Sequence, residues 1–297
     1  MIDKLEFLLA LAREQHFGRA AEVCGVTQPT LSAGIKQLEE SFGVLLVHRG
    51  SRFRDFTPEG ERVLNWARRI VGDARAMREE VQALKHGLAG RLRIAAIPTA
   101  LAMIERLTTP YREQHPNVQF TVLSRNSEDI LRLLDNLEID AGVTYLDNEP
   151  LNRVTTIPLY RERYRLLISA NAPLGNRDKV TWAEVAQVPL CLLTPDTQTR
   201  RIIDHLLREA GGDPQVSLES NAMILLYAHV RTGRWASVMP ARLAATLGLT
   251  DVLRAIPIVE PEAGHAIGLV APAREPMTPL TSALVAEARR VAPSLAD

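Results

Sequence analysis

The feature that most constrains this chain is a long helical pattern that begins at Pro58, runs without a break to His86 and is ended by Gly87. Its apolar positions alternate spacings of four and three residues, as in the seam of a two-stranded coiled coil. A helix lying on the core of its own domain usually shows a wider apolar stripe. The pattern therefore predicts a dimerising helix over residues 59–88 between two domains, 1–58 and 89–297. The predicted seam consists of Val63, Ala67, Ile70, Ala74, Met77, Val81 and Leu84.

The composition excludes membrane-spanning and disordered classes. The chain is 46% hydrophobic and 24% charged, which is ordinary for a globular protein of more than one domain. The longest stretch without Asp, Glu, Lys or Arg runs from Val23 to Ile35 and is too short to cross a bilayer. The N-terminus shows no basic segment followed by an apolar one, as a secretory signal would. We expect a cytoplasmic protein without membrane contact.

Two short helical patterns in the N-terminal domain meet across a turn that contains Gly25. Thr27 is a good N-cap for the second helix, and Leu31, Ile35 and Leu38 form its buried stripe. This is a helix-turn-helix, whose second helix enters the major groove of DNA. The side chains at its start and on its outer face offer amide, hydroxyl and ammonium groups to bases and phosphates. The predicted DNA contacts of this helix are Thr27, Gln28, Pro29, Thr30, Ser32, Ala33 and Lys36.

The segment after this helix predicts a β-hairpin with a tight turn at residues 50–51. Arg49, Arg52 and Arg54 surround the turn and suit a wing that binds phosphates. The alternative for residues 1–57 is a small three-helix domain that packs against something other than DNA. The 35 basic and 35 acidic residues give a net charge of zero, which argues against nucleic acid only if the charges are evenly spread.

From residue 91 strands alternate with helices, which predicts a parallel sheet with helices on both faces. The first strands are expected at 92–97, 118–123 and 141–143. A second set is expected at 165–169, 190–193 and 236–239, with helices at 198–210, 223–232 and 241–247, and the chain closes with a strand at 267–271 and a helix at 279–291. We expect two subdomains, about 91–162 with 266–297 and about 163–265, separated by a cleft.

Ligands of such sheets bind beyond the carboxyl ends of the strands, where helix N-termini favour anions. Hydroxyl side chains gather in the loops at these positions, and Ser127 is expected to cap the helix that follows it. Each hydroxyl taken alone is explained better as a helix cap than as a ligand contact, and only their shared position after strands makes the two explanations equal. The predicted effector contacts are Thr99, Ala100, Ser127, Thr144, Thr197 and Thr199, with a carboxylate or other small anion as the effector. Leu101, Met103 and Met223 fit an apolar pocket equally well.

The N-terminal segment closely resembles that of LysR-type transcriptional regulators, and the resemblance extends over essentially the whole chain. Its most specific part is the winged helix-turn-helix pattern. The matching residues are 17–21 (FGRAA), 26–32 (VTQPTLS), Ile35, 38–39 (LE), 42–43 (FG), 45–46 (LL), Arg49 and 57–60 (TPEG).

The resemblance implies a winged helix-turn-helix, a dimerising linker helix and an effector domain like the periplasmic binding proteins. It also implies that Gln28, Pro29, Thr30, Ser32 and Lys36 contact DNA and that Thr99 lies where many members hold the acidic group of an effector. The chain departs from the pattern after Ser32. Ala33 and Gly34 stand where many members have an arginine, so the base specificity of a typical member does not carry over.

We therefore expect a ligand-responsive transcription factor that binds double-stranded promoter DNA with dyad symmetry as a homodimer or homotetramer. One alternative is a small-molecule binding protein whose N-terminal domain only mediates oligomerisation. Another is a thiol redox sensor that acts through Cys191, although Cys24 lies far away in the sequence. No nucleophile, phosphate-binding or metal-ligand motif is present, so we expect neither an enzyme nor a bound cofactor or metal.

Overall fold

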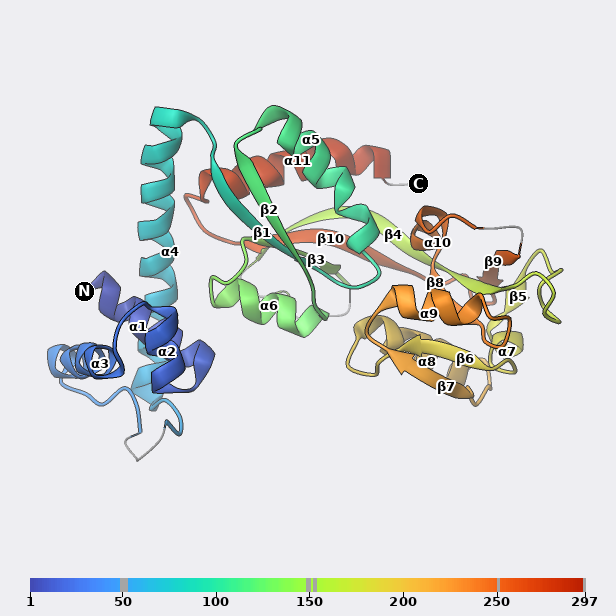
Figure 1. The fold of residues 1–297 in the computed structure, drawn as a ribbon, viewed down its shortest axis with the longest axis horizontal. Coiled ribbons are helices and arrows are strands. Elements are labelled where there is room, and N and C mark those ends of the chain that lie inside the picture. Colours follow the sequence, from blue (N-terminus) through green and yellow to red (C-terminus); the bar gives the residue numbers. More distant parts are fainter. Residues whose placement is uncertain (49–52, 148–150, 152–153, 250–251, 296–297) are drawn as a thin grey trace. The chain divides into compact units, whose positions relative to one another are not determined.

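The computed structural model describes residues 1–48, 53–147, 151, 154–249 and 252–295. It contains two compact units (Figure 1). The first comprises residues 1–88 with the short segments 135–138 and 274–279, and the second comprises the rest of the chain. None of the helices in the described ranges is long and apolar enough to cross a membrane.

Three short helices form the N-terminal part of the first unit: α1 (Ile2–Glu14), α2 (Phe17–Val23) and α3 (Gln28–Phe42). Gly25 makes the turn between α2 and α3 with a φ of 66°, a conformation that glycine adopts without strain. Thr27 caps α3 by accepting the N–H of Thr30, as the sequence predicts. The expected stripe of Leu31, Ile35 and Leu38 is buried against Leu8 and its neighbours in the core.

The long helix α4 (Pro58–His86) confirms the expected element and ends at Gly87, whose φ is 72°. Thr57 caps it, and the same hydroxyl donates to the carbonyl oxygen of Leu45 at 2.6 Å. Its first turn approaches the preceding segment closely, because a Cβ at Gly60 would lie 2.1 Å from the carbonyl oxygen of Leu46. The start of α4 is therefore fixed against the residues that lead into the wing.

The second unit begins with a parallel arrangement of β2 (Val118–Ser124), β1 (Gly90–Ala96) and β3 (Ala141–Tyr145). Figure 1 shows α5 (Glu105–Gln114) and α11 (Pro279–Leu295) on one face and α6 (Ser127–Asp135) on the other. A 3-10 turn, η1 (Leu101–Met103), precedes α5. These strands and helices agree with the expected elements to within a few residues.

The prediction of a parallel sheet holds only in part, because two long strands join the halves of this unit in antiparallel fashion. β4 (Val154–Ser169) pairs with β10 (Gly264–Pro272) over its first part and with β8 (Ser237–Pro240) and β9 (Leu253–Val259) over its second. Only the end of β4, at residues 165–169, was expected. The first part of β4 was missed because polar and charged residues alternate along it. Such an alternation is typical of a strand that is buried mainly on one face.

The remaining elements form the second half of this unit. β6 (Leu190–Leu193) and β7 (Val216–Ser220) pair in parallel, and a single bridge joins Leu190 to Ala236 beside β8. β5 (Val180–Thr181) pairs with β9. The helices are α7 (Trp182–Val185), α8 (Gln198–Glu209), α9 (Met223–Val230) and α10 (Ala241–Thr246).

Candidate DNA-binding and effector sites

The N-terminal end of α3 presents an exposed polar surface. Six of the predicted contact residues are exposed, and Ser32 is half-buried. The hydroxyls of Thr27 and Thr30 lie 2.8 Å apart, so both side chains are held at the start of the helix. Lys36 lies one turn further on and forms an exposed ion pair with Glu40 at 3.7 Å. The exposed residues are Thr27, Gln28, Pro29, Thr30, Ala33 and Lys36.

Gly34 follows Ala33 at the position where the sequence departs from the pattern described above. It lies on the inner face of α3. A Cβ there would lie 2.7 Å from a ring carbon of Phe7 on α1. Because this contact leaves no room for a side chain, glycine allows α1 and α3 to pack closely. Ala33 is exposed, and its short side chain offers no hydrogen bond to a base.

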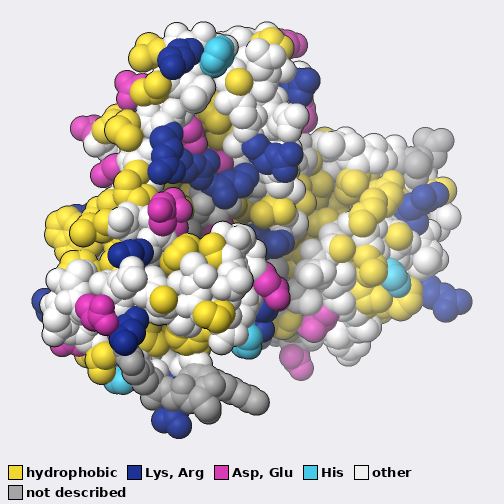
Figure 2. Space-filling view, turned by 60° about the vertical axis from the view of Figure 1, so that its left-hand side comes forward, with side chains coloured by type: hydrophobic (Ala, Val, Ile, Leu, Met, Phe, Trp, Pro, Cys, Tyr) yellow, Lys and Arg dark blue, Asp and Glu magenta, His cyan; other side chains and the backbone are white. Residues whose placement is uncertain are grey.

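The base of the wing is paired, although its tip lies outside the described residues. The His48 N–H donates to the carbonyl oxygen of Asp55 at 3.0 Å, and Val47 forms an antiparallel bridge with Phe56. Arg54 is described and exposed, whereas Arg49 and Arg52 fall in the range for which no structure is given. On the face seen in Figure 2, several basic side chains gather in one band, and acidic and apolar side chains surround it.

The predicted seam of α4 divides into two parts. Ala67 is fully buried in the core of the first unit, and Val63 packs against that core, so these two residues hold α4 to its own domain. Further along the helix the apolar side chains are open: Ile70 is 40% exposed, Met77 60%, Val81 46% and Leu84 83%, and Ala74 is half-buried. The start of α4 therefore packs on the core of its own domain. The rest of the helix carries a narrow stripe of exposed apolar side chains.

A pocket of about 620 Å³ lies beyond the carboxyl ends of β1, β2 and β6 in the second unit. Arg125, Asp129 and Asp196 bring charges to its wall, and the Asn126 amide donates to Asp196 at 3.3 Å. The hydroxyl of Thr194 holds the pKa of Asp196 below its usual range. Its apolar lining is Pro98, Leu101, Ala222, Met223, Ile224, Leu243 and Leu247. Leu101 and Met223 thus lie where the apolar alternative expected them, whereas Met103 does not line this pocket.

The six predicted effector residues are all buried, but only Thr197 lines this pocket. Its hydroxyl caps α8, accepting from the N–H of Arg200 at 3.3 Å and donating to the carbonyl oxygen of Thr194 at 2.9 Å. Ala100 is buried and its N–H donates to the carbonyl oxygen of Ile97. Thr99 lies next to Pro98 on the pocket wall. Thr197 and Ala100 are thus already engaged in local hydrogen bonds.

Thr144 and Ser127 both lie at α6. Thr144 and Gly142 lie on the same face of β3, because they are two residues apart. A Cβ at Gly142 would contact Ile130 of α6, so the Thr144 side chain points toward α6. The prediction that Ser127 caps α6 is wrong: the Asn126 side chain accepts the N–H of Asp129 at 2.8 Å instead. The hydroxyls of Ser127 and Thr144 are both buried without a hydrogen bond.

A buried acid that the sequence did not single out lies on β4, next to Tyr145. Glu162 on β4 is 1% exposed, and Tyr145 donates to its Oε1 at 2.5 Å. Thr199 on α8 lies 3.0 Å from the same tyrosine oxygen. Burial raises the pKa of the Glu162 carboxyl to about 7, against the opposing effect of the Tyr145 and Thr99 hydroxyls. In the sequence, the only sign that Glu162 is buried is the alternation of exposed and buried positions along β4. Only residues 165–169 of this strand were expected.

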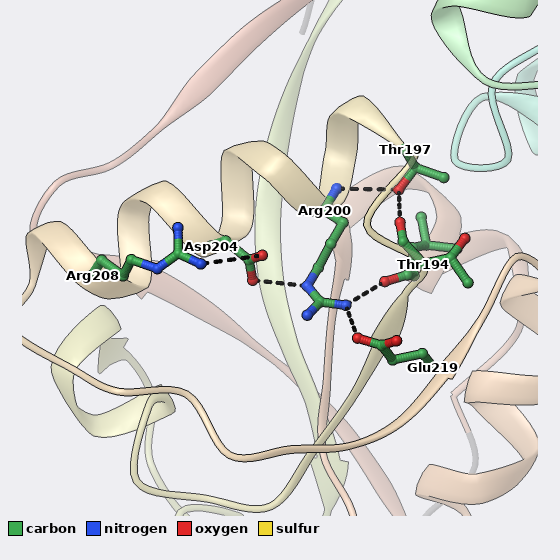
Figure 3. A network of polar contacts seen from close by, with 7 residues as sticks. Thr194, Thr197, Arg200, Asp204, Arg208 and Glu219 are labelled. Carbon is green, nitrogen blue, oxygen red and sulfur yellow. Dashed lines mark hydrogen bonds and ion pairs between the residues drawn. The ribbon is translucent and has the colours of Figure 1, made fainter.

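Arg200 fixes the first turns of α8 to the strands beside it (Figure 3). Its guanidinium donates to Asp204 at 2.8 Å, to Glu219 on β7 at 2.7 Å and to the carbonyl oxygen of Leu193 at the end of β6 at 2.8 Å. The pKa of Arg200 is raised by these carboxylates despite the opposing effect of burial. This network around the buried Arg200 holds Thr197 and Thr199 in place.

The two cysteines have environments that disfavour a thiolate. Cys191 on β6 is fully buried, its thiol lies 3.7 Å from the carbonyl oxygen of Leu226, and burial raises its pKa to about 11. Cys24 lies in the first unit, and burial also raises its pKa. Within the described ranges no group of three or more His, Cys, Asp and Glu side chains is placed to hold a metal ion.

A helix-turn-helix with an open recognition surface, a long helix with an exposed apolar stripe and a pocketed α/β unit together define a ligand-responsive DNA-binding regulator. Residues 2–61 match the family model described as "Bacterial regulatory helix-turn-helix protein, lysR family", and residues 85–293 match the "LysR substrate binding domain". The chain therefore belongs to the LysR family of transcriptional regulators, which are not enzymes.

Known relatives agree with this assignment. The chain is 30% identical over 282 residues to the DNA-binding transcriptional dual regulator OxyR of Escherichia coli, covering 95% of this chain and 91% of the relative. It is 29% identical to the regulator CfxR of Cupriavidus necator over 75% of this chain and 71% of that one. A full-length OxyR variant from Pseudomonas aeruginosa has a TM-score of 0.77 at 27% identity, over 97% of this chain and 94% of that one. CbnR in complex with its target DNA has the same fold, with a TM-score of 0.62 at 20% identity over 98% of this chain and all of that one.

Proposed function

We propose that the regulator reads its promoter site through the start of α3 and grips the DNA backbone through the wing. The observation that carries this proposal is the exposed row of amide, hydroxyl and ammonium groups on α3, which suits base edges and phosphates. At the first turn Pro29 has no N–H and Thr27 accepts the N–H of Thr30, so side chains rather than free backbone N–H groups carry the contacts there. Arg54, with Arg49 and Arg52, supplies positive charge at the wing.

We propose that two copies pair through the open part of α4, with 1–58 as the DNA-binding domain, 59–88 as the linker and 89–297 as the effector domain. The exposed side chains of Ile70, Met77, Val81 and Leu84 would be covered by the same residues of a second copy. Two recognition helices then meet two half-sites related by a two-fold axis. Binding of promoter DNA implies that the protein acts in the cytoplasm.

We propose that the pocket beyond β1, β2 and β6 receives the effector, and that the effector carries a carboxylate or other small anion. Arg125 on its wall and the N-terminal end of α8 favour a negative charge, against the opposing effect of Asp129 and Asp196 on the same wall. An effector that binds one arrangement of the two halves better than another shifts the population toward it. Asn126 and Asp196 form a hydrogen bond between the halves at 3.3 Å and would report such a shift.

Peroxide sensing is a second candidate, favoured by the similarity to OxyR and to relatives named as hydrogen peroxide-inducible genes activators. The environment of Cys191 opposes it, because a thiol with a raised pKa supplies little of the reactive thiolate. Peroxide treatment of the wild type and of a Cys191→Ser variant tests this candidate. Peroxide that alters DNA binding of the wild type but not of the variant would establish the thiol mechanism.

The DNA-binding proposal is tested by a gel shift on the DNA upstream of the gene and on scrambled DNA of the same length. We expect a shift of the upstream DNA at salt concentrations that abolish binding to the scrambled DNA. Equal affinity for both would contradict specific recognition. Thermal-shift measurements against small carboxylates test the effector pocket separately, since a ligand of the folded state raises the melting temperature.

A further inference from the structure

Trp66 is a large aromatic side chain of α4 that the predicted seam leaves out. It is 62% exposed, although tryptophan side chains are well buried on average. The seam residues that precede and follow it, Val63 and Ala67, pack on the core of the first unit instead. Trp66 therefore stays on the surface at the point where the predicted seam turns toward its own domain.

Helical geometry places Trp66 in line with the open apolar side chains of α4. The helix is continuous through this range (Figure 1). With 3.6 residues per turn, Trp66 and Leu84 are about five turns apart and point in the same direction. Met77 lies about three turns from Trp66, and Ile70 is its i+4 neighbour. These four residues, with Val81 at the edge, form the exposed line of α4.

Charged side chains run along both sides of the exposed line. Asp73 and Glu80 lie on one side, Arg78 and Lys85 lie on the other, and all four are exposed. An apolar stripe between two charged rows is the surface that a helix presents in a coiled coil, where the partner helix covers the stripe and the charges stay in water. The exposed line therefore fits another helix.

Arg69 holds the ring of Trp66 on the helix surface. Its guanidinium carbon lies 5.4 Å from the centre of the ring, which is a cation–π contact. A ring that is already ordered loses little side-chain entropy when a partner covers it. Tryptophan and arginine are also the residues most enriched among those that dominate the binding energy of interfaces. Trp66 thus has the properties of a residue that anchors a contact.

We propose that Trp66 anchors the contact between two copies of the chain and is buried there by the α4 helix of the second copy. The inference rests on the proposed pairing through α4 and deepens it, because it moves the start of the contact from Val63 and Ala67 to Trp66. A second copy is the occupant that the chain itself supplies, since LysR regulators form oligomers. Trp66 also continues directly from Ile70, which the proposed pairing already covers.

Tryptophan fluorescence of the full chain reports on the burial of Trp66. The chain has three tryptophans, of which Trp182 is fully buried and Trp235 is half-buried. The difference between the wild type and a Trp66→Phe variant, measured where both associate, isolates the signal of Trp66. We expect this signal to be shielded from iodide in the associated chain and to become accessible when dilution separates the copies.

Trp66→Ser should weaken self-association by about 10-fold or more in sedimentation velocity, because the interface loses its largest apolar side chain. Asn65→Ser is the matched control. Asn65 is exposed on the same turn of α4, but its side chain points away from the exposed line. Its association should equal that of the wild type. Circular dichroism checks that both variants keep the helical content of the wild type.

The outcomes that overturn the inference differ in what they mean for the pairing through α4. If Trp66→Ser associates as tightly as the wild type while Leu84→Glu does not, Trp66 lies outside the contact and the pairing stands. If neither substitution weakens association, both proposals fail. Shielding of Trp66 that persists after the copies have separated means that its own chain covers the ring, which also contradicts the inference.

Discussion

The Oε1 atom of Glu39 accepts the backbone N–H of Leu46 at 2.9 Å, which links the recognition helix α3 to the base of the wing. The same oxygen accepts the N–H of Val47 at 3.3 Å. Glu39 is buried, and the close approach of Gly60 to the Leu46 carbonyl fixes the start of α4 to the same segment. The Glu39 side chain thus fixes the position of the base of the wing relative to the recognition helix α3.

Replacing Glu39 with alanine should destabilise the first unit by about 1–3 kcal/mol, because two backbone N–H groups lose a charged acceptor. Denaturant unfolding followed by circular dichroism measures the change. Glu40→Ala is the control. Glu40 forms only an exposed pair with Lys36, and its loss should change the free energy of unfolding by less than about 1 kcal/mol. Equal effects of the two substitutions would show that the hydrogen bonds of Glu39 contribute little.

Gln28 and Arg54 should affect DNA binding in different ways. Gln28→Ala should cost about 1–3 kcal/mol on the preferred site and little on scrambled DNA, because a base contact discriminates sequences. Arg54→Ala should weaken binding to both DNAs and reduce the slope of log K against log salt by about 1. Fluorescence anisotropy over a salt series measures both effects, with Arg106→Ala on α5 as the control. A uniform loss for Gln28→Ala would refute its role in specificity.

Leu84→Glu should weaken self-association by about 10-fold or more without unfolding the chain. Leu84 is 83% exposed in the single chain, so a charge there is harmless until a second α4 covers it. Gln82→Glu adds the same charge at another exposed position of α4, outside the predicted seam, and should leave association unchanged. Sedimentation velocity distinguishes the outcomes, and equal behaviour of the two variants would place the contact elsewhere.

The sequence predicted the first unit well because its signals are local. Thr27 as a cap, the Leu31, Ile35 and Leu38 stripe and Gly87 as a helix end depend on neighbours within a few residues, and all three are as expected. The division of the α4 stripe was not predictable in this way. Ala67 and Leu84 follow the same spacing, and only the packing of α4 on its own domain buries the first and leaves the second open.

The buried polar cluster around Glu162 was harder to predict because its residues meet through long-range pairing. Thr99 and Thr199 were found from their positions after strands, but Glu162 was not, since β4 was expected only from residue 165. Residues 161–163 were not assigned to an element, whereas in β4 the alternation buries Glu162 between two exposed arginines. The pairing of β4 with β10, which is distant in the sequence, then places Glu162 opposite His265.

The stability of the protein should fall as pH rises because of Glu162. Its pKa is about 7 in the folded chain and near 4.5 when unfolded, so between these values the folded state holds a proton that the unfolded state has lost. The difference corresponds to about 3 kcal/mol, lost progressively from about pH 4.5 to 7. Burial lowers the pKa of His265, which acts in the opposite direction, so wild type and E162Q must be compared at each pH. We expect the wild type to lose stability relative to E162Q across this range in denaturant unfolding, and parallel curves would mean that Glu162 titrates as an exposed carboxyl.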